Sequence, residues 1–179
     1  MARYRIIPER SWVEIRARSN VHPIETRTVG LTGFVELVLS SNGRIDLTSP
    51  LSGTVSLRVE NLSSGNPLQD RELRRRIDAR RHPTIDGVLV GMRETPTDDR
   101  YGLRGDVTFR GVTRTVEDEM TVTSAGNADE LQLEGEAMFN IRDFGMDPPK
   151  ILLFRVEPEV RVKAHIVAVR VGATTSVGR

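Results

Sequence analysis

The heptapeptide VRVKAHI, residues 160–166, alternates apolar and polar side chains one by one. Successive side chains of an extended strand point to opposite faces, so this alternation separates an apolar face from a polar one. The apolar face consists of Val160, Val162, Ala164 and Ile166, and the polar face of Arg161, Lys163 and His165. The pattern is typical of an antiparallel strand that packs one face on a core and turns the other to water.

The same two-residue period recurs along most of the chain. It is clearest in residues 13–18, 55–60, 103–109 and 131–139. Turn-forming residues separate the runs, as in Ser41-Asn42-Gly43 and Thr97-Asp98-Asp99. Roughly eight to ten such runs at regular spacing, without an alternating strand–helix rhythm, predict an all-β sandwich or barrel.

One segment, from Asn66 to Pro83, breaks the alternation and predicts a short helix. Asn66 is a favourable N-cap, and Pro67 suits the first helical position. Leu73 and Ile77 are four residues apart and therefore share a face of the helix. The helix is predicted to end at Pro83, because the residue before a proline disfavours helical geometry.

Length and composition bound the class of protein. The chain has 179 residues, enough for one domain with its own core, which we place at residues 1–170, followed by a flexible tail at 171–179. It has no cysteine, and its 26 Lys and Arg residues balance 25 Asp and Glu residues. We see no signal peptide and no apolar run of the roughly 18 residues that a membrane-spanning helix needs. We therefore expect a cytoplasmic protein without stable membrane insertion.

No set of residues has the signature of a catalytic or metal centre. The triplet Asp143-Phe144-Gly145 also binds magnesium in protein kinases, but the other kinase motifs are missing. His22, His82 and His165 are too far apart in the sequence to indicate a metal site. No serine lies in a nucleophile-elbow context. The sequence therefore predicts no enzyme, no metal and no cofactor.

The predicted helix is rich in arginine, which raises the question of nucleic-acid binding. Its arginines are Arg71, Arg74, Arg75, Arg76, Arg80 and Arg81. Acidic residues on the same helix dilute the positive field, and the chain has few aromatic residues to stack on bases: one Trp, two Tyr and five Phe. We expect a solvated helix face and no nucleic-acid partner.

Several motifs, in this order, resemble those of a known family. The two most specific are GDVTFRGVTRTVE at residues 105–117 and FNIRDFGM at 139–146. YRIIPERSWVEI lies near the N-terminus, ARRHPTI follows the helix, and VEPEVRVKAHIVA lies near the C-terminus. Together they resemble the YceI-like family of lipocalin-like proteins that bind polyisoprenoids, from Tyr4 to about Val169.

This resemblance implies an all-β, lipocalin-like antiparallel barrel of about eight strands with one short helix beside an opening. It further implies a polyisoprenoid, isoprenoid quinone or other lipid in an apolar interior, no established catalytic residues, and a homodimer. Residues 143–145 would then form a corner at the end of a strand. Candidates for the apolar lining are Val55, Leu57, Val59, Leu73, Ile77, Val107, Phe109, Ala137, Phe139, Phe144, Val160, Val162 and Ala164. Candidates for contact with a head group are Arg74, Arg75 and Arg80.

Three functions remain open at this point. The first is non-catalytic carriage or sequestration of an apolar or amphiphilic ligand, favoured because small inward residues leave dispersion contacts that a ligand tail would restore. The second is a structural or interaction role for a barrel that its own side chains fill. The third is an enzyme with chemistry on the barrel rim, which convergent polar groups at the mouth would favour.

Overall fold

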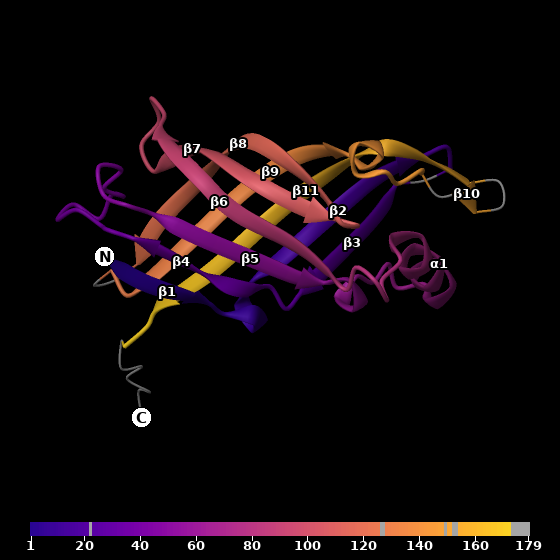
Figure 1. Ribbon diagram of the computed structural model, residues 1–179, viewed down its shortest axis with the longest axis horizontal. Helices are drawn as coiled ribbons and strands as arrows, with labels where there is room; N and C mark the ends of the chain where they lie inside the picture. The colour runs from indigo at the N-terminus through magenta and orange to yellow at the C-terminus, as the bar shows by residue number, and fades with distance from the viewer. Residues whose placement is uncertain (22, 126–127, 149, 152–153, 173–179) are drawn as a thin grey trace.

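The computed structural model describes residues 1–21, 23–125, 128–148, 150–151 and 154–172 (Figure 1). Within these residues the chain forms an 11-stranded sheet, one α-helix and short 3-10 helices, which confirms the all-β class. From residue 173 onward, the tail predicted to be flexible lies outside the described residues. No helix in the described ranges is long and apolar enough to cross a membrane.

The strands run antiparallel to their neighbours. They are β1 (Ala2–Ile6), β2 (Trp12–Ser19), β3 (Ile24–Val29), β4 (Thr32–Leu37), β5 (Ser52–Arg58), β6 (Thr84–Glu94), β7 (Arg100–Phe109), β8 (Val112–Ala125), β9 (Glu130–Asn140), β10 (Lys150–Ile151) and β11 (Phe154–Arg170). The helices are α1 (Pro67–Ile77) and the 3-10 turns η1 (Pro8–Arg10), η2 (Val59–Asn61) and η3 (Ile141–Phe144).

The sheet closes into a ring, which confirms the predicted barrel. Its order is β1-β4-β5-β6-β7-β8-β9-β11, and β11 pairs with β1 to complete eight strands. The long strand β11 makes this closure with its C-terminal part, where Ala168 lies opposite Ile6. Its preceding part pairs instead with β2, which carries β3 as a branch. At the end of this branch, the Thr28 hydroxyl donates to the carbonyl of Asn61 at 2.5 Å.

The register of β11 confirms the faces that the sequence predicts. Val162 lies opposite Ala137 of β9 and Ile15 of β2, and all three point to the interior. The next residue, Lys163, lies between Glu136 and Glu14 on the outside. The outer wall is therefore a set of cross-strand charge pairs around an apolar inner face.

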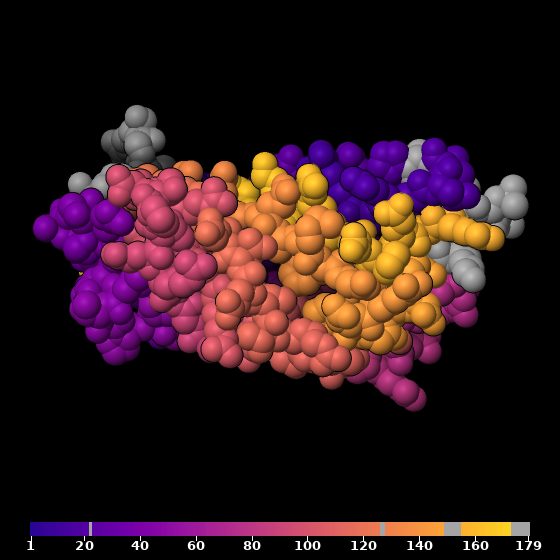
Figure 2. Space-filling model, turned by 90° about the horizontal axis from the view of Figure 1, so that it is seen from above, coloured from indigo at the N-terminus to yellow at the C-terminus, as the bar shows by residue number. Residues whose placement is uncertain are grey.

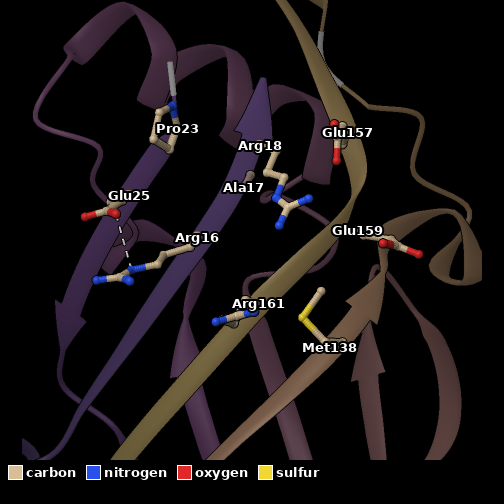
Figure 3. Close-up of a pocket in the computed structure, with 9 residues that line it drawn as sticks. All are labelled: Arg16, Ala17, Arg18, Pro23, Glu25, Met138, Glu157, Glu159 and Arg161. Atoms are coloured by element: carbon tan, nitrogen blue, oxygen red, sulfur yellow. Dashed lines mark ion pairs between the residues drawn. The ribbon is translucent and has the colours of Figure 1, made fainter. Parts of the chain in front are cut away.

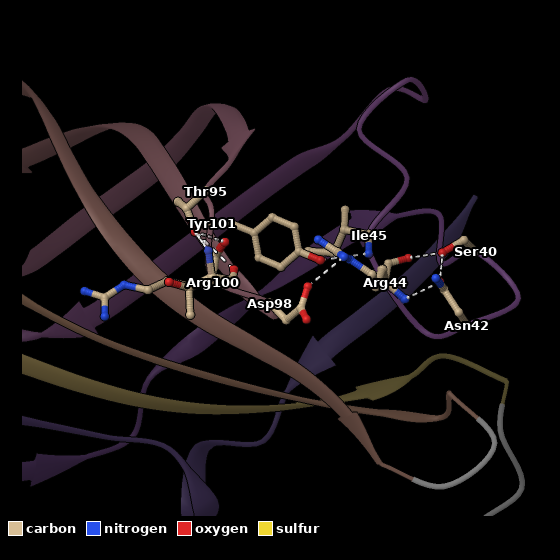
Figure 4. Close-up of polar contacts among 9 residues, drawn as sticks. Ser40, Asn42, Arg44, Ile45, Thr95, Asp98, Arg100 and Tyr101 are labelled. Carbon is tan, nitrogen blue, oxygen red and sulfur yellow. Dashed lines mark hydrogen bonds and ion pairs between the residues drawn. The ribbon is translucent and has the colours of Figure 1, made fainter.

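The barrel end away from α1 is filled by a packed core, and we call it the closed end. Tyr4 and Tyr101 are each only 1% exposed there. The Tyr4 hydroxyl donates to the carbonyl of Ala128 at 2.9 Å, and the Tyr101 oxygen accepts the N–H of Ile45 at 3.2 Å (Figure 4). Both phenols thus form hydrogen bonds with backbone groups that the packed core of the closed end would otherwise leave unpaired.

At the opposite end, which we call the helix end, α1 begins as predicted but ends earlier (Figure 1). The Asn66 side chain accepts the N–H groups of Leu68 and Gln69 at 3.0 and 3.3 Å. The last helical residue is Ile77, because Asp78 adopts a left-handed conformation with φ 57° and donates its N–H to carbonyls of the last turn. The prediction that the helix continues to Pro83 is therefore wrong.

Asp70 anchors α1 to the segment that precedes it. Its carboxylate accepts the backbone N–H and the hydroxyl of Ser64, both at 2.7 Å, and the hydroxyl of Ser63 at 2.9 Å. Burial by itself raises the pKa of Asp70, but these hydrogen bonds outweigh it and hold the pKa below its ordinary value. The ionised carboxylate therefore stabilises this end of the barrel.

Candidate ligand-binding interior

The inner face of the barrel changes from packed to accessible along single strands. On β11, Ala168 is fully buried and Ile166 is 8% exposed, whereas Ala164, Val162 and Val160 are half-buried. On β9, Leu131 and Leu133 are buried, whereas the following inward positions, 135, 137 and 139, are half-buried. Beyond the closed end, the walls therefore leave apolar inner surface that opposite side chains do not cover.

Glycines widen the interior at the same level. Gly87 lies opposite Val55 and Val107, Gly105 lies opposite Val116, and Gly135 lies opposite Ala164, all at inward positions. A Cβ at Gly87 would lie 2.9 Å from a methyl carbon of Val55, so a larger residue would not fit between the strands there. Because Gly87 has no side chain, the space on its inner side belongs to the lumen. The alternation of the sequence could have revealed these positions, because each glycine takes the place of an inward apolar residue.

The predicted lining residues fall into two groups. Leu57, Val59, Ile77 and Phe144 are buried. Half-buried are Val55, Leu73, Val107, Phe109, Ala137, Phe139, Val160, Val162 and Ala164. Val59, Leu73, Ile77 and Phe144 belong to η2, α1 and η3, so they form the plug of the helix end rather than the strand wall. Apart from the buried Leu57, the strand residues among the candidates supply the accessible inner surface.

Phe144 has the role expected of a corner residue. It is 4% exposed, and its ring centroid lies 5.8 Å from that of Phe109 and 6.4 Å from that of Phe139. Gly145 follows with φ 68°, and its carbonyl accepts a hydrogen bond from Arg110 of the β7–β8 turn. Asp143 itself is exposed. The triplet therefore fixes a strand end, in agreement with the interpretation drawn from the sequence.

Two of the three predicted head-group arginines are bound to protein groups. Arg74 donates to the carbonyls of Glu60 and Leu62 at 3.1 and 3.3 Å. Arg75 makes a two-pronged pair with Glu72, at 2.9 and 2.8 Å. Arg80 is exposed and has no ion pair within the described part of the chain. Arg74 thus holds the helix to η2, a role that the sequence alone did not reveal.

A second hollow lies on the outside of the barrel, and sequence reasoning missed it. This groove of about 260 Å³ follows β2, β3, β9 and β11 (Figure 3). It is lined by Arg16, Arg18, Arg161, Glu25, Glu157 and Glu159, with Met138, Ala17 and Pro23. The pairing of β11 with β2 shifts register between Val156 and Val160, around Pro158, which cannot donate to the ladder. Its charged lining distinguishes it from the apolar interior.

His82 and His165, the two histidines that the structure describes, do not converge on one site. His165 contacts Glu134 at 2.8 Å and stacks on Trp12, and the ring of His82 lies against Gly111. His22 lies outside the described residues. Within the described ranges, no group of three or more His, Cys, Asp or Glu side chains could hold a metal ion.

Similar proteins support the fold. The protein resembles the crystal structure of BcnA from Burkholderia cenocepacia, with a TM-score of 0.76 and 18% identity over 92% of this chain and 99% of that chain. It also resembles a polyisoprenoid binding domain from Saccharophagus degradans implicated in plant cell wall breakdown, with a TM-score of 0.74 and 9% identity over 96% and 100%. The YCEI protein of Campylobacter jejuni gives a TM-score of 0.63 and 10% identity over 83% and 85%.

The sequence itself decides the family. At such low identities the structural matches establish a shared fold and nothing finer. No curated protein matches the sequence. The model of the YceI-like domain, however, matches residues 4–168, which is nearly the whole chain. The closed eight-stranded barrel with a single helix agrees with that match, so the chain belongs to the YceI-like family.

Proposed function

We propose that the barrel binds the apolar chain of a long hydrophobic or amphiphilic ligand, without covalent chemistry, for carriage or sequestration. The observation that carries this proposal is the change of burial along β9 and β11. An inner wall that turns from fully buried to half-buried, while it remains apolar, supports a lumen that a ligand completes.

The wall residues define the chemistry of the ligand. Val55, Val107, Ala137, Val162 and Ala164 present methyl groups, and the inward glycines add room without polar atoms. Each buried methylene of a ligand would contribute about 0.8 kcal/mol. A polyisoprenoid fits this wall, and a domain of the same fold from Saccharophagus degradans is described as polyisoprenoid binding. An isoprenoid quinone or another lipid satisfies the same contacts.

The alternative to ligand binding is a barrel that its own side chains fill and that serves in interactions with other proteins. The closed end is packed in the way that a filled barrel requires, but the accessible surface of β9 and β11 favours a ligand. Assembly as a homodimer, which the family resemblance implies, and a cytoplasmic location, which the sequence predicts, stay predictions.

The test is native mass spectrometry of protein purified without denaturant, followed by organic extraction. A bound lipid or quinone at a ratio of one per chain is the expected result. Protein that is empty after expression in several hosts, and that takes up no added polyprenol, would contradict the proposal and favour the filled barrel.

A further inference from the structure

The wall of the barrel is interrupted between β8 and β9. Backbone pairing joins residues 120–125 of β8 to residues 130–135 of β9 and extends no further. Both strands continue beyond this point, held by β7 on one side and β11 on the other. About five residues of each strand thus face each other without a ladder, over a length of about 15 Å. Figure 2 looks onto this side and shows a hollow between the salmon atoms of β8 and the orange atoms of β9.

Charges on the outer face oppose a longer ladder. Continuation of the register would set Glu119 opposite Glu136 on the outer face, and like charges directly opposite destabilise a strand pair. Each carboxylate pairs with the neighbouring strand on its far side instead. Glu119 lies 2.6 Å from Arg100 of β7, and Glu136 lies 3.4 Å from Arg161 of β11. Both carboxylates therefore have their ion-pair partners on strands away from the gap.

The edge of the gap on β8 carries polar side chains that face the interior. Arg114 lies opposite Val107 and Asp118 opposite Leu103, which places both on the inner face, yet both are exposed. Neither forms an ion pair with a described residue, and each has a local hydrogen bond: Arg114 donates to the Thr113 carbonyl, and Asp118 accepts from the Glu119 N–H. An inward carboxylate can be exposed only where water reaches the interior.

The other inward residues of the rim are apolar. Val116 lies between the two polar residues on the inner face of β8 and is half-buried. Across the gap, Ala137 and Phe139 face inward from β9, and Met138 is 57% exposed on its outer face. A mixed rim of this kind matches an amphiphile, whose chain seeks the interior and whose polar end stays in water.

Among the described residues, those at the two ends of the barrel leave no comparable access. The closed end is filled by Tyr4 and Tyr101, each 1% exposed. The helix end is filled by Val59, Ile77 and Phe144, which are 0%, 1% and 4% exposed. The accessible inner surface lies between these two plugs, at the level of the gap.

We propose that the gap between β8 and β9 is a lateral portal, through which the apolar chain of an amphiphile enters and leaves the barrel. The polar end of the ligand remains at the rim beside Arg114 and Asp118, rather than beside the arginines of α1. This inference rests on the proposed function, because a portal has a role only if the interior takes up a ligand.

The test bridges the gap in a chain that has no cysteine of its own. Glu117→Cys and Met138→Cys place exposed thiols at positions that would be opposite each other if the ladder continued. A bismaleimide with a reducible linker joins them. The control is Thr121→Cys with Glu134→Cys, an exposed pair that the ladder already joins. The probe is geranylgeraniol with an environment-sensitive fluorophore, mixed with each protein by stopped flow.

Bridging across the gap should slow uptake and release at least tenfold, with little change in affinity, and reduction of the linker should restore both rates. The control bridge should change the rates less than twofold. Equal rates for bridged and unbridged protein would overturn the portal and leave the proposed function standing. Absence of uptake by the wild-type protein would refute the proposed function and the portal with it.

Discussion

Replacement of Ala164 by tryptophan should block ligand uptake while it leaves the fold intact. Ala164 points inward from β11 and lies between Gly135 and Val13 on the neighbouring strands. An indole there takes about the space of one isoprene unit, whose roughly five carbons each contribute about 0.8 kcal/mol when buried. Their loss removes about 4 kcal/mol of binding free energy, which weakens the affinity by roughly three orders of magnitude.

The stability of this variant should fall much less than its affinity. Insertion of a larger side chain into a well-packed core costs about 1–3 kcal/mol, and the absent side chain of Gly135 places Ala164→Trp at the low end of that range. The matched control is Lys163→Trp, which adds the same ring on the outer face of the same strand.

Two measurements separate the effects. Fluorescence titration with a labelled polyprenol gives the affinity, and urea unfolding gives the free energy of unfolding. The control should bind like the wild-type protein. If Ala164→Trp binds the polyprenol as tightly as Lys163→Trp does, the position does not line a ligand site and the reasoning from burial fails.

Three further predictions concern stability. The pKa of Asp70 is lower in the folded protein than in the unfolded chain, where it is about 3.9. The contribution of Asp70 to stability is therefore present above about pH 3.9 and is lost as the pH falls through the folded-state pKa. Asp70→Asn should lose less stability than the wild type between about pH 5 and pH 2, as measured by urea unfolding. Tyr101→Phe leaves the N–H of Ile45 without its partner and should lower the free energy of unfolding by about 1–3 kcal/mol, measured by urea unfolding; an unchanged value would show that water replaces the phenol. Asp78→Gly removes the strain of a left-handed backbone at a non-glycine residue, so it should raise the free energy of unfolding by about 1 kcal/mol and raise the melting temperature. A lower melting temperature would mean that the contacts of the Asp78 side chain stabilise the fold by more than this backbone strain costs.

The alternation of side chains predicts the strands and their two faces because that information is local. The inward direction of Val162 and the outward direction of Lys163 follow from the sequence and are confirmed by the register. The start of α1 is equally local, since Asn66 and Pro67 act within one helical turn.

Features that depend on which strands meet could not be read in the same way. The gap between β8 and β9 begins where Glu119 would lie opposite Glu136, and the sequence alone does not give the register that brings these two residues together. The binding of Arg74 to carbonyls of Glu60 and Leu62 likewise requires the path of the chain between η2 and α1. The early end of the helix at Asp78 depends on a left-handed residue that is not glycine, which propensity disfavours.

The pairing of β11 with strands from both ends of the chain has a consequence for how the protein is made. Because this strand pairs with β1, β2 and β9, β2 lacks one of its two partners, and β1 cannot close the barrel, until the last strand has been synthesised. Nucleation on such distant contacts is slow, and unpaired strand edges attract other chains in the meantime. A nascent chain that stalls before residue 154 therefore holds an open sheet with unpaired strand edges. The final steps of translation are then the stage at which the chain is most exposed to aggregation and to chaperones.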